Sequence, residues 1–233
     1  MEDCVKRIGE LERLFSDNQY YGRGKDAFFI EEGIVPVMVS APHAVKQFRD
    51  GKIKKADVYT GGIARYLHEV TGCHLICSGR YTENDPNYDQ PGSNAYQDAL
   101  LEYLNGRRIA ALLDLHGVVK EREYAIELGT VPTLSEEDTS LHEYKFIADL
   151  LIGIFESGFK ECSCEKKSVW KNKIFSAGNQ NTVTKFISEN TDTVCVQLEI
   201  NRIYREPENR KEFAALIRSL REVIGFLAAY DWK

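Results

Sequence analysis

The sequence predicts an α/β protein, a single domain with a mixed, largely parallel central sheet and helices on both faces. Apolar runs rich in β-branched residues alternate with segments of helical periodicity, which is the pattern of sheets covered by helices. Several of these runs are apolar on both faces, as expected for strands buried on both sides. No repeat, low-complexity tract or linker divides the 233 residues, so one domain over 1–233 is expected.

Ten segments carry this pattern. The segments predicted as strands are 33–40, 73–78, 108–117, 124–130 and 192–202. The segments with the spacing of amphipathic helices are 54–72, 94–106, 140–158, 181–190 and 209–230. Gly72 and Gly106 stand where two of these helices are expected to stop, because glycine readily adopts the backbone conformation of a helix C-terminus.

The amino-acid composition argues against nucleic acid and membranes as binding partners. The chain has 36 acidic and 30 basic residues and a net charge of −6, which disfavours nucleic acid because phosphate binding needs a basic surface. The N-terminal segment is charged and no apolar run approaches the ~20 residues that cross a bilayer. A cytoplasmic protein with reduced cysteines and no membrane partner is therefore expected. Nothing in the sequence specifies an oligomeric state.

Polar residues follow several predicted strands, where open α/β sheets collect their ligands. His43 follows the first strand and His116 ends the third. Either histidine alone is explained by an imidazole bonded to backbone, but two at equivalent places favour metal ligation or acid–base chemistry. Asp114 lies two residues before His116, so it shares a face with it and could orient an imidazole or a bound water. Capping of the turn at Gly117 is the alternative for Asp114.

Glu199 closes the last strand, where a buried carboxylate needs a partner. It is either a general base beside a metal site or the partner of Arg202 or Arg205 in a structural ion pair. Arg80 and Arg202 suit a substrate carboxylate or a developing oxyanion, and each suits a surface ion pair equally well.

Two further residues have simple structural explanations. Asn87 in "NDPNYDQPG" could reach a substrate, although turn formation alone explains that run. Asp57 opens the helix predicted from residue 54, where an acidic residue complements the helix dipole. Nucleotide-binding glycine motifs and a Gly-x-Ser-x-Gly motif do not occur, so nucleotide binding and serine-hydrolase chemistry have no support.

The motifs "SAPHAV", "NDPNYD", "LLDLHG" and "VQLEINRIYREP", in this order, resemble the N-formylglutamate amidohydrolase family. That family is similar in core fold to zinc carboxypeptidases and aspartoacylase-type deacylases. The resemblance runs from His43 to about Pro207. It implies a zinc-dependent amidohydrolase on a phosphorylase/hydrolase-like α/β sandwich, with His43 and His116 as zinc ligands and Glu199 as the catalytic glutamate.

The same resemblance extends to the substrate side. Arg80 and the turn that contains Asn87 match the region of the substrate carboxylate and the oxyanion, and Arg202 belongs to the "NR" after the base. Carboxypeptidase-type sites use a His-x-x-Glu pair, but Lys46 stands at that position here. The third metal ligand is therefore not given by local spacing, and Asp57 is the nearest match to an acidic residue of the family.

The expected function is zinc-dependent hydrolysis of an N-formyl or N-acyl amide in a small substrate that carries a carboxylate, such as an N-acyl amino acid. One zinc ion, or another divalent metal, is the expected cofactor. Two alternatives stay open. One is an inactive module that binds small anions on the same scaffold, and the other is a peptidase of the zinc carboxypeptidase type.

Overall fold

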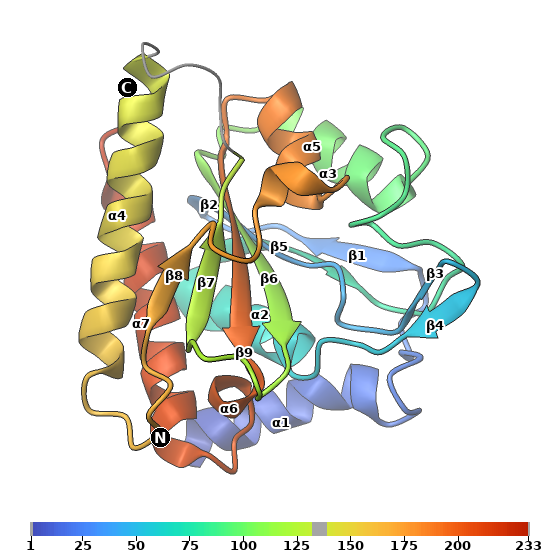
Figure 1. Ribbon diagram of the computed structural model, residues 1–233. Helices are drawn as coiled ribbons and strands as arrows, with labels where there is room; N and C mark the ends of the chain where they lie inside the picture. Colours follow the sequence, from blue (N-terminus) through green and yellow to red (C-terminus); the bar gives the residue numbers. More distant parts are fainter. Residues whose placement is uncertain (1, 132–138, 233) are drawn as a thin grey trace.

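A computed structural model of the chain describes residues 2–131 and 139–232 and has a seven-stranded sheet at its centre (Figure 1). The strand order is β1-β5-β2-β6-β9-β7-β8. The strands are β1 Phe28–Glu31, β2 Val35–Ala41, β5 Cys73–Ser78, β6 Ala111–Val118, β7 Ile126–Gly129, β8 Val169–Lys171 and β9 Val194–Asn201. The four central strands β5, β2, β6 and β9 are parallel, whereas β1 and β7 run antiparallel to their neighbours β5 and β9. The predicted α/β class with a mixed, largely parallel sheet is confirmed.

Helices cover both faces of this sheet. One face packs against α1 Glu2–Ser16, α2 Thr60–Thr71, α4 Thr139–Phe159 and α7 Arg210–Ala229, and the other against α3 Ala95–Asn105 and α5 Val183–Asn190. Successive strand residues point to opposite faces, so Val37 and Val39 belong to the first core and Met38 to the second. The remaining helices are short, the 3₁₀ turn Ala177–Asn179 and α6 Arg202–Arg205. Within the described residues, no helix has the length and apolar character that a bilayer crossing requires.

All five predicted strands are present. The helix predicted from residue 54 begins six residues later, because Gln47–Arg49 (β3) and Lys52–Lys54 (β4) form a small hairpin and a turn follows it. Sequence patterning missed this hairpin and the edge strands β1 and β8, which have three or four residues each. Strands of that length are too short to show a period of two.

The topology brings three strand ends together. The strands β2, β6 and β9 lie side by side and run in the same direction, so their carboxyl ends share one edge of the sheet. In the pairing of β6 with β9, His116 lies directly beside Glu199. His43 comes two residues after β2 ends. This edge is where the polar side chains of the candidate site gather.

Candidate metal centre

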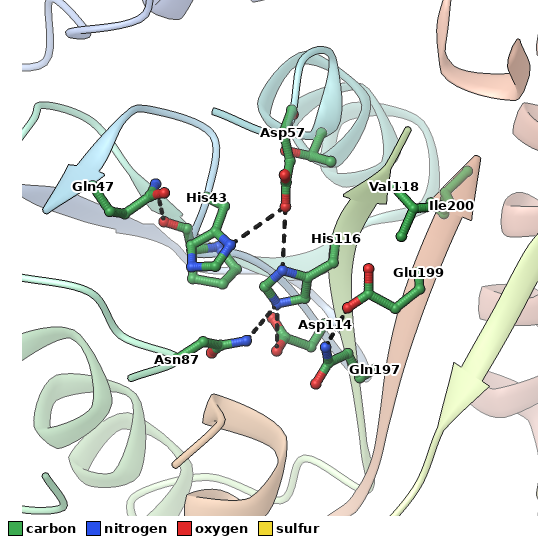
Figure 2. A network of polar contacts seen from close by, with 12 residues as sticks. His43, Gln47, Asp57, Asn87, Asp114, His116, Val118, Gln197, Glu199 and Ile200 are labelled. Carbon is green, nitrogen blue, oxygen red and sulfur yellow. Dashed lines mark hydrogen bonds and ion pairs between the residues drawn. The ribbon is translucent and has the colours of Figure 1, made fainter. Parts of the chain in front are cut away.

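Two histidines and an aspartate converge at this edge of the sheet (Figure 2). Oδ2 of Asp57 lies 3.4 Å from Nδ1 of His43 and 3.3 Å from Nδ1 of His116. The two imidazole rings meet edge to face, with centroids 4.7 Å apart. Among the side chains of residues 2–131 and 145–232, this is the one group of three His, Cys, Asp or Glu residues whose ligand atoms lie within 4.8 Å of one another.

The backbone explains how Asp57 reaches the histidines from outside the sheet. Its N–H donates to the carbonyl of His43 (2.8 Å), which draws the segment before α2 against the end of β2. Its carbonyl accepts from the backbone N–H and the hydroxyl of Thr60 (3.1 and 2.7 Å), the residue at which α2 starts. The carboxylate itself points to the imidazoles, and Asp57 lies before α2 rather than in its first turn, so it is not the acidic residue opening a helix that the sequence suggested.

A carboxylate stands behind each imidazole. Nε2 of His43 lies 2.8 Å from Oδ1 of Asp85, and Nε2 of His116 lies 3.1 Å from Oδ2 of Asp114. Asp57 lies on the Nδ1 side of both rings. A metal ion that displaced the protons there would find a carboxylate behind each imidazole, as is usual for metal-binding histidines. Asp114 therefore orients His116 and does not cap the turn at Gly117, since β6 continues to Val118.

Charged neighbours shift the pKa values of Asp57 and His116. Burial acts to raise the pKa of Asp57, but hydrogen bonds from His116 and His43 outweigh it and hold the pKa well below its usual value. Burial likewise acts to lower the pKa of His116, and Asp114 and Asp57 reverse this and raise the pKa to about 10. The ammonium of Lys54 lies 3.2 Å from Nδ1 of His43, so the cluster already attracts a cation.

This donor set fits a divalent metal ion. Two imidazole nitrogens and one carboxylate oxygen are a ligand set that zinc accepts, with a fourth position left for water or substrate. A metal ion on Nδ1 of His43 would take the place of the Lys54 ammonium as the partner of that atom. Lys54 ends the small hairpin, and its long side chain can move without any change in the sheet.

The cluster lines a cavity of about 440 Å³ that Glu199 also lines. Glu199 is 6% exposed, and its Oε1 accepts a hydrogen bond from Nε2 of Gln197 at 2.6 Å. Burial raises the pKa of Glu199, and the neighbouring His116 only partly offsets this. Among the described residues Glu199 forms no ion pair, since Arg205 donates to backbone carbonyls instead and Arg202 pairs with Glu206 (2.6 Å). A carboxylate with a raised pKa beside a candidate metal-binding cluster has the properties of a general base.

The other residues singled out from the sequence divide into two groups. Asn87 lines the cavity, where its Nδ2 lies 2.8 Å from Nε2 of His116 and its Oδ1 accepts from the backbone N–H of Val183 (2.9 Å). Arg202 and Arg80 do not line it. Arg202 is exposed, and Arg80 borders a separate cavity of about 60 Å³.

The separation of Arg80 from the site follows from the topology. Arg80 follows β5, which lies on the far side of β2 from β6 and β9, and its backbone N–H donates to Ala27 beside the antiparallel strand β1. Lys46, at the position of the missing glutamate, also borders the smaller cavity, with its ammonium 4.0 Å from the ring centroid of Tyr21. Neither side chain reaches the histidines.

Sequence reasoning missed several residues that build the site. Asp85 lies within the motif "NDPNYD", but only the folded structure shows that it contacts His43 and the guanidinium of Arg49 (2.7 Å). Arg122 lies in the loop between β6 and β7 and lines the cavity beside Phe175, with its guanidinium 5.5 Å from the ring centroid. No carboxylate among the described residues pairs with Arg122. Nothing in the local sequence distinguishes it from a surface arginine.

Several solved protein structures have a fold similar to that of this chain. No protein-family model and no curated protein matches the chain. An N-formylglutamate amidohydrolase from Ralstonia eutropha JMP134 has a similar structure, with a TM-score of 0.57, 15% identity, and coverage of 88% of this chain and 97% of that one. A gene product of Agrobacterium tumefaciens has a TM-score of 0.54 and 16% identity, with coverage of 93% and 97%. The cell shape determinant protein Csd4 of Helicobacter pylori, as a variant, has a TM-score of 0.54 and 11% identity, with coverage of 88% and 57%. At these identities the likeness is one of fold.

Proposed function

We propose that the protein is a metal-dependent amidohydrolase, with zinc as the metal, that cleaves the N-formyl or N-acyl amide of a small carboxylate-bearing molecule such as an N-acyl amino acid. The observation that carries the proposal is the single cavity shared by the cluster of His43, Asp57 and His116 and by the buried carboxylate of Glu199. The likeness in fold to an N-formylglutamate amidohydrolase is consistent with it.

The roles of the residues follow from their positions. His43, Asp57 and His116 would hold the ion, which when bound polarises a carbonyl and lowers the pKa of water. Glu199 takes a proton from the water that attacks the amide carbonyl carbon. It passes that proton to the nitrogen as the C–N bond breaks, so that a carboxylic acid and an amine leave. The raised pKa of Glu199 makes it a stronger base for the first step and an acid for the second.

A substrate carboxylate would find its partner among the cations that line the cavity, which are Arg49, Lys54 and Arg122. Arg49 is paired with Asp85, and Lys54 lies against His43. Arg122 keeps its charge available, and a guanidinium can bind a carboxylate through two parallel hydrogen bonds. We assign the substrate carboxylate to Arg122 in place of Arg80 and Arg202. The net charge of −6 supports a small molecule rather than nucleic acid as the partner.

An assay with matched substrates tests the proposal. Purified protein, stripped of metal and reloaded with zinc, is expected to release formate or acetate from N-formyl or N-acetyl amino acids. It should be much slower on the same amides with the carboxylate replaced by a neutral amide. Binding of these compounds without turnover in the zinc-loaded protein would instead establish an anion-binding module. Cleavage confined to the C-terminal bond of peptides would establish the peptidase.

A further inference from the structure

Behind the cavity lies a buried arginine for which the proposed reaction has no use. Arg205 is the last residue of α6, is 3% exposed and does not line the cavity. Its guanidinium donates to three backbone carbonyls. Nε donates to Ile200 (3.0 Å), Nη2 donates to Val118 (3.2 Å), and Nη1 donates to Val58.

These three carbonyls belong to the segments that carry the site. Val58 directly follows Asp57, and Ile200 directly follows Glu199. Val118 is two residues after His116, and Figure 2 shows it and Ile200 beside each other on β6 and β9. The sheet already fixes β6 relative to β9, but the segment that carries Asp57 lies outside the sheet. Arg205 ties that segment to both strands.

The glycine of the motif "LLDLHG" fits this arrangement. A Cβ atom added to Gly117 would lie 2.4 Å from Cζ and from Nη2 of Arg205, far inside van der Waals contact. The guanidinium therefore packs directly against the backbone of the residue that follows His116. Since Gly117 also lines the cavity, one peptide unit separates Arg205 from the space where a substrate would bind.

The charge of Arg205 is not used in an ion pair. No carboxylate of residues 2–131 or 145–232 lies within ion-pair distance of its guanidinium, although a buried charge is ordinarily paired. Burial lowers its pKa, and the more distant carboxylates of Asp57, Glu12 and Glu199 act against this. All its short contacts are thus with the backbone, which suits a group that holds chain segments in place.

We infer that Arg205 is a positioning residue that sets the place of Asp57 relative to His116 and Glu199. The chemical meaning of this inference rests on the proposed function, because these three residues are the metal ligands and the base of that proposal. Arg205 touches neither metal ligand nor substrate. It acts through the backbone carbonyls of Val58, Val118 and Ile200.

The test compares Arg205→Lys with Leu220→Ala, which opens a cavity in the buried α7 face without contacting the site. Lysine keeps the charge but cannot bond all three carbonyls in one plane. Zinc affinity, measured by competition with a chelator, is expected to fall about 10- to 100-fold in Arg205→Lys, the usual size of an outer-shell effect. It should stay unchanged in Leu220→Ala, even if both variants melt at lower temperature. In Arg205→Ala, free guanidinium at millimolar concentration should restore part of the affinity.

Nitrogen NMR of the imidazole rings in metal-free protein decides the inference independently of metal binding. Arg205→Lys should shift the ring resonances of His43 and His116 and leave those of His68 and His74 in place. Unshifted resonances of His43 and His116 would overturn the positioning role. A wild-type protein that binds no zinc would overturn the proposed function, and the metal-free spectra would still settle the role of Arg205.

Discussion

Two buried acidic regions lie on either side of the start of α2, and their carboxylates have different partners. On one side, Asp57 contacts two imidazoles at a cavity. On the other side, Glu12 of α1 is 3% exposed and accepts from the backbone N–H of Tyr59 (2.7 Å) and of Gly62 (2.8 Å), and from the hydroxyl of Tyr20 (2.9 Å).

The difference shows that the partners of a buried carboxylate, rather than its burial, distinguish a candidate metal site from a structural one. Glu12 satisfies backbone N–H groups that the first turn of a helix leaves without intrahelical partners, so it stabilises α2 against α1. Asp57 faces ring nitrogens that could also bind a metal. Replacement of residues in the two regions should therefore affect different measurements.

The largest effect is expected for the base. Glu199→Gln removes the group that moves the proton, so kcat should fall about 10²- to 10⁴-fold. The variant keeps the shape of the side chain and all three metal ligands, so zinc content should match that of the wild type. Steady-state kinetics and metal analysis on one preparation measure both. Retention of more than a tenth of the wild-type kcat would remove Glu199 from the mechanism.

A smaller effect is expected at the rim of the cavity. Arg122→Ala removes a charge-assisted hydrogen bond to the substrate carboxylate, so kcat/KM should fall about 10- to 100-fold for N-acyl amino acids. The loss should disappear for an analogue whose carboxylate is replaced by a neutral amide. Arg80→Ala, beside the separate cavity, is the matched control. If Arg80→Ala shows the loss and Arg122→Ala does not, our assignment of the carboxylate is wrong.

Three residues of the candidate site could be predicted from the sequence because they lie at the ends of predicted strands. His43, His116 and Glu199 were located because parallel strands deliver their carboxyl ends to one edge, and the apolar runs of β2, β6 and β9 are long enough to recognise. Asp57 was proposed as a ligand only through the family resemblance. Its position depends on the hairpin β3–β4 and on a hydrogen bond to His43 that no sequence period encodes.

The rest of the site depends on contacts between residues far apart in the chain. Asp85 meets a histidine 42 residues away, and Arg205 meets the carbonyl of Val58 147 residues away. Arg80 was misplaced because sequence order does not reveal that β5 pairs on the outer side of β2. Spatial strand order, which arises from packing of the whole sheet, decides which strand ends are neighbours.

In the structural region, the change is in stability. Glu12→Gln leaves at least one buried N–H at the start of α2 without an acceptor, so the free energy of unfolding should fall by about 1–3 kcal/mol. Chemical denaturation at neutral pH measures this loss. The zinc stoichiometry should stay that of the wild type, because His43, Asp57 and His116 are untouched. A variant with wild-type stability would contradict the structural role of Glu12.

The last effect is a pH dependence of the stability that belongs to Glu12. Burial raises its pKa from 4.5 to about 7, despite hydrogen bonds from Tyr59, Gly62 and Tyr20 that favour the charged form. Between these two pH values the folded protein holds a proton that the unfolded chain has lost, so the contribution to stability falls as pH rises from 4.5 to about 7. The slope is at most about 1.4 kcal/mol per pH unit. Denaturation at pH 5 and pH 7.5 should show a larger loss in the wild type than in Glu12→Gln, and equal losses would count against the raised pKa.

Zinc stoichiometry in two aspartate variants shows whether Asp57 helps to hold a metal ion. Asp57→Asn keeps the size of the side chain but removes the charge between the two imidazoles. Asp192→Asn makes the same change at an exposed position beyond the opposite end of β9. We expect one zinc ion per chain in the wild type and in Asp192→Asn, and a content far below one in Asp57→Asn dialysed under the same conditions. A full zinc ion retained by Asp57→Asn would contradict the metal centre of His43, Asp57 and His116.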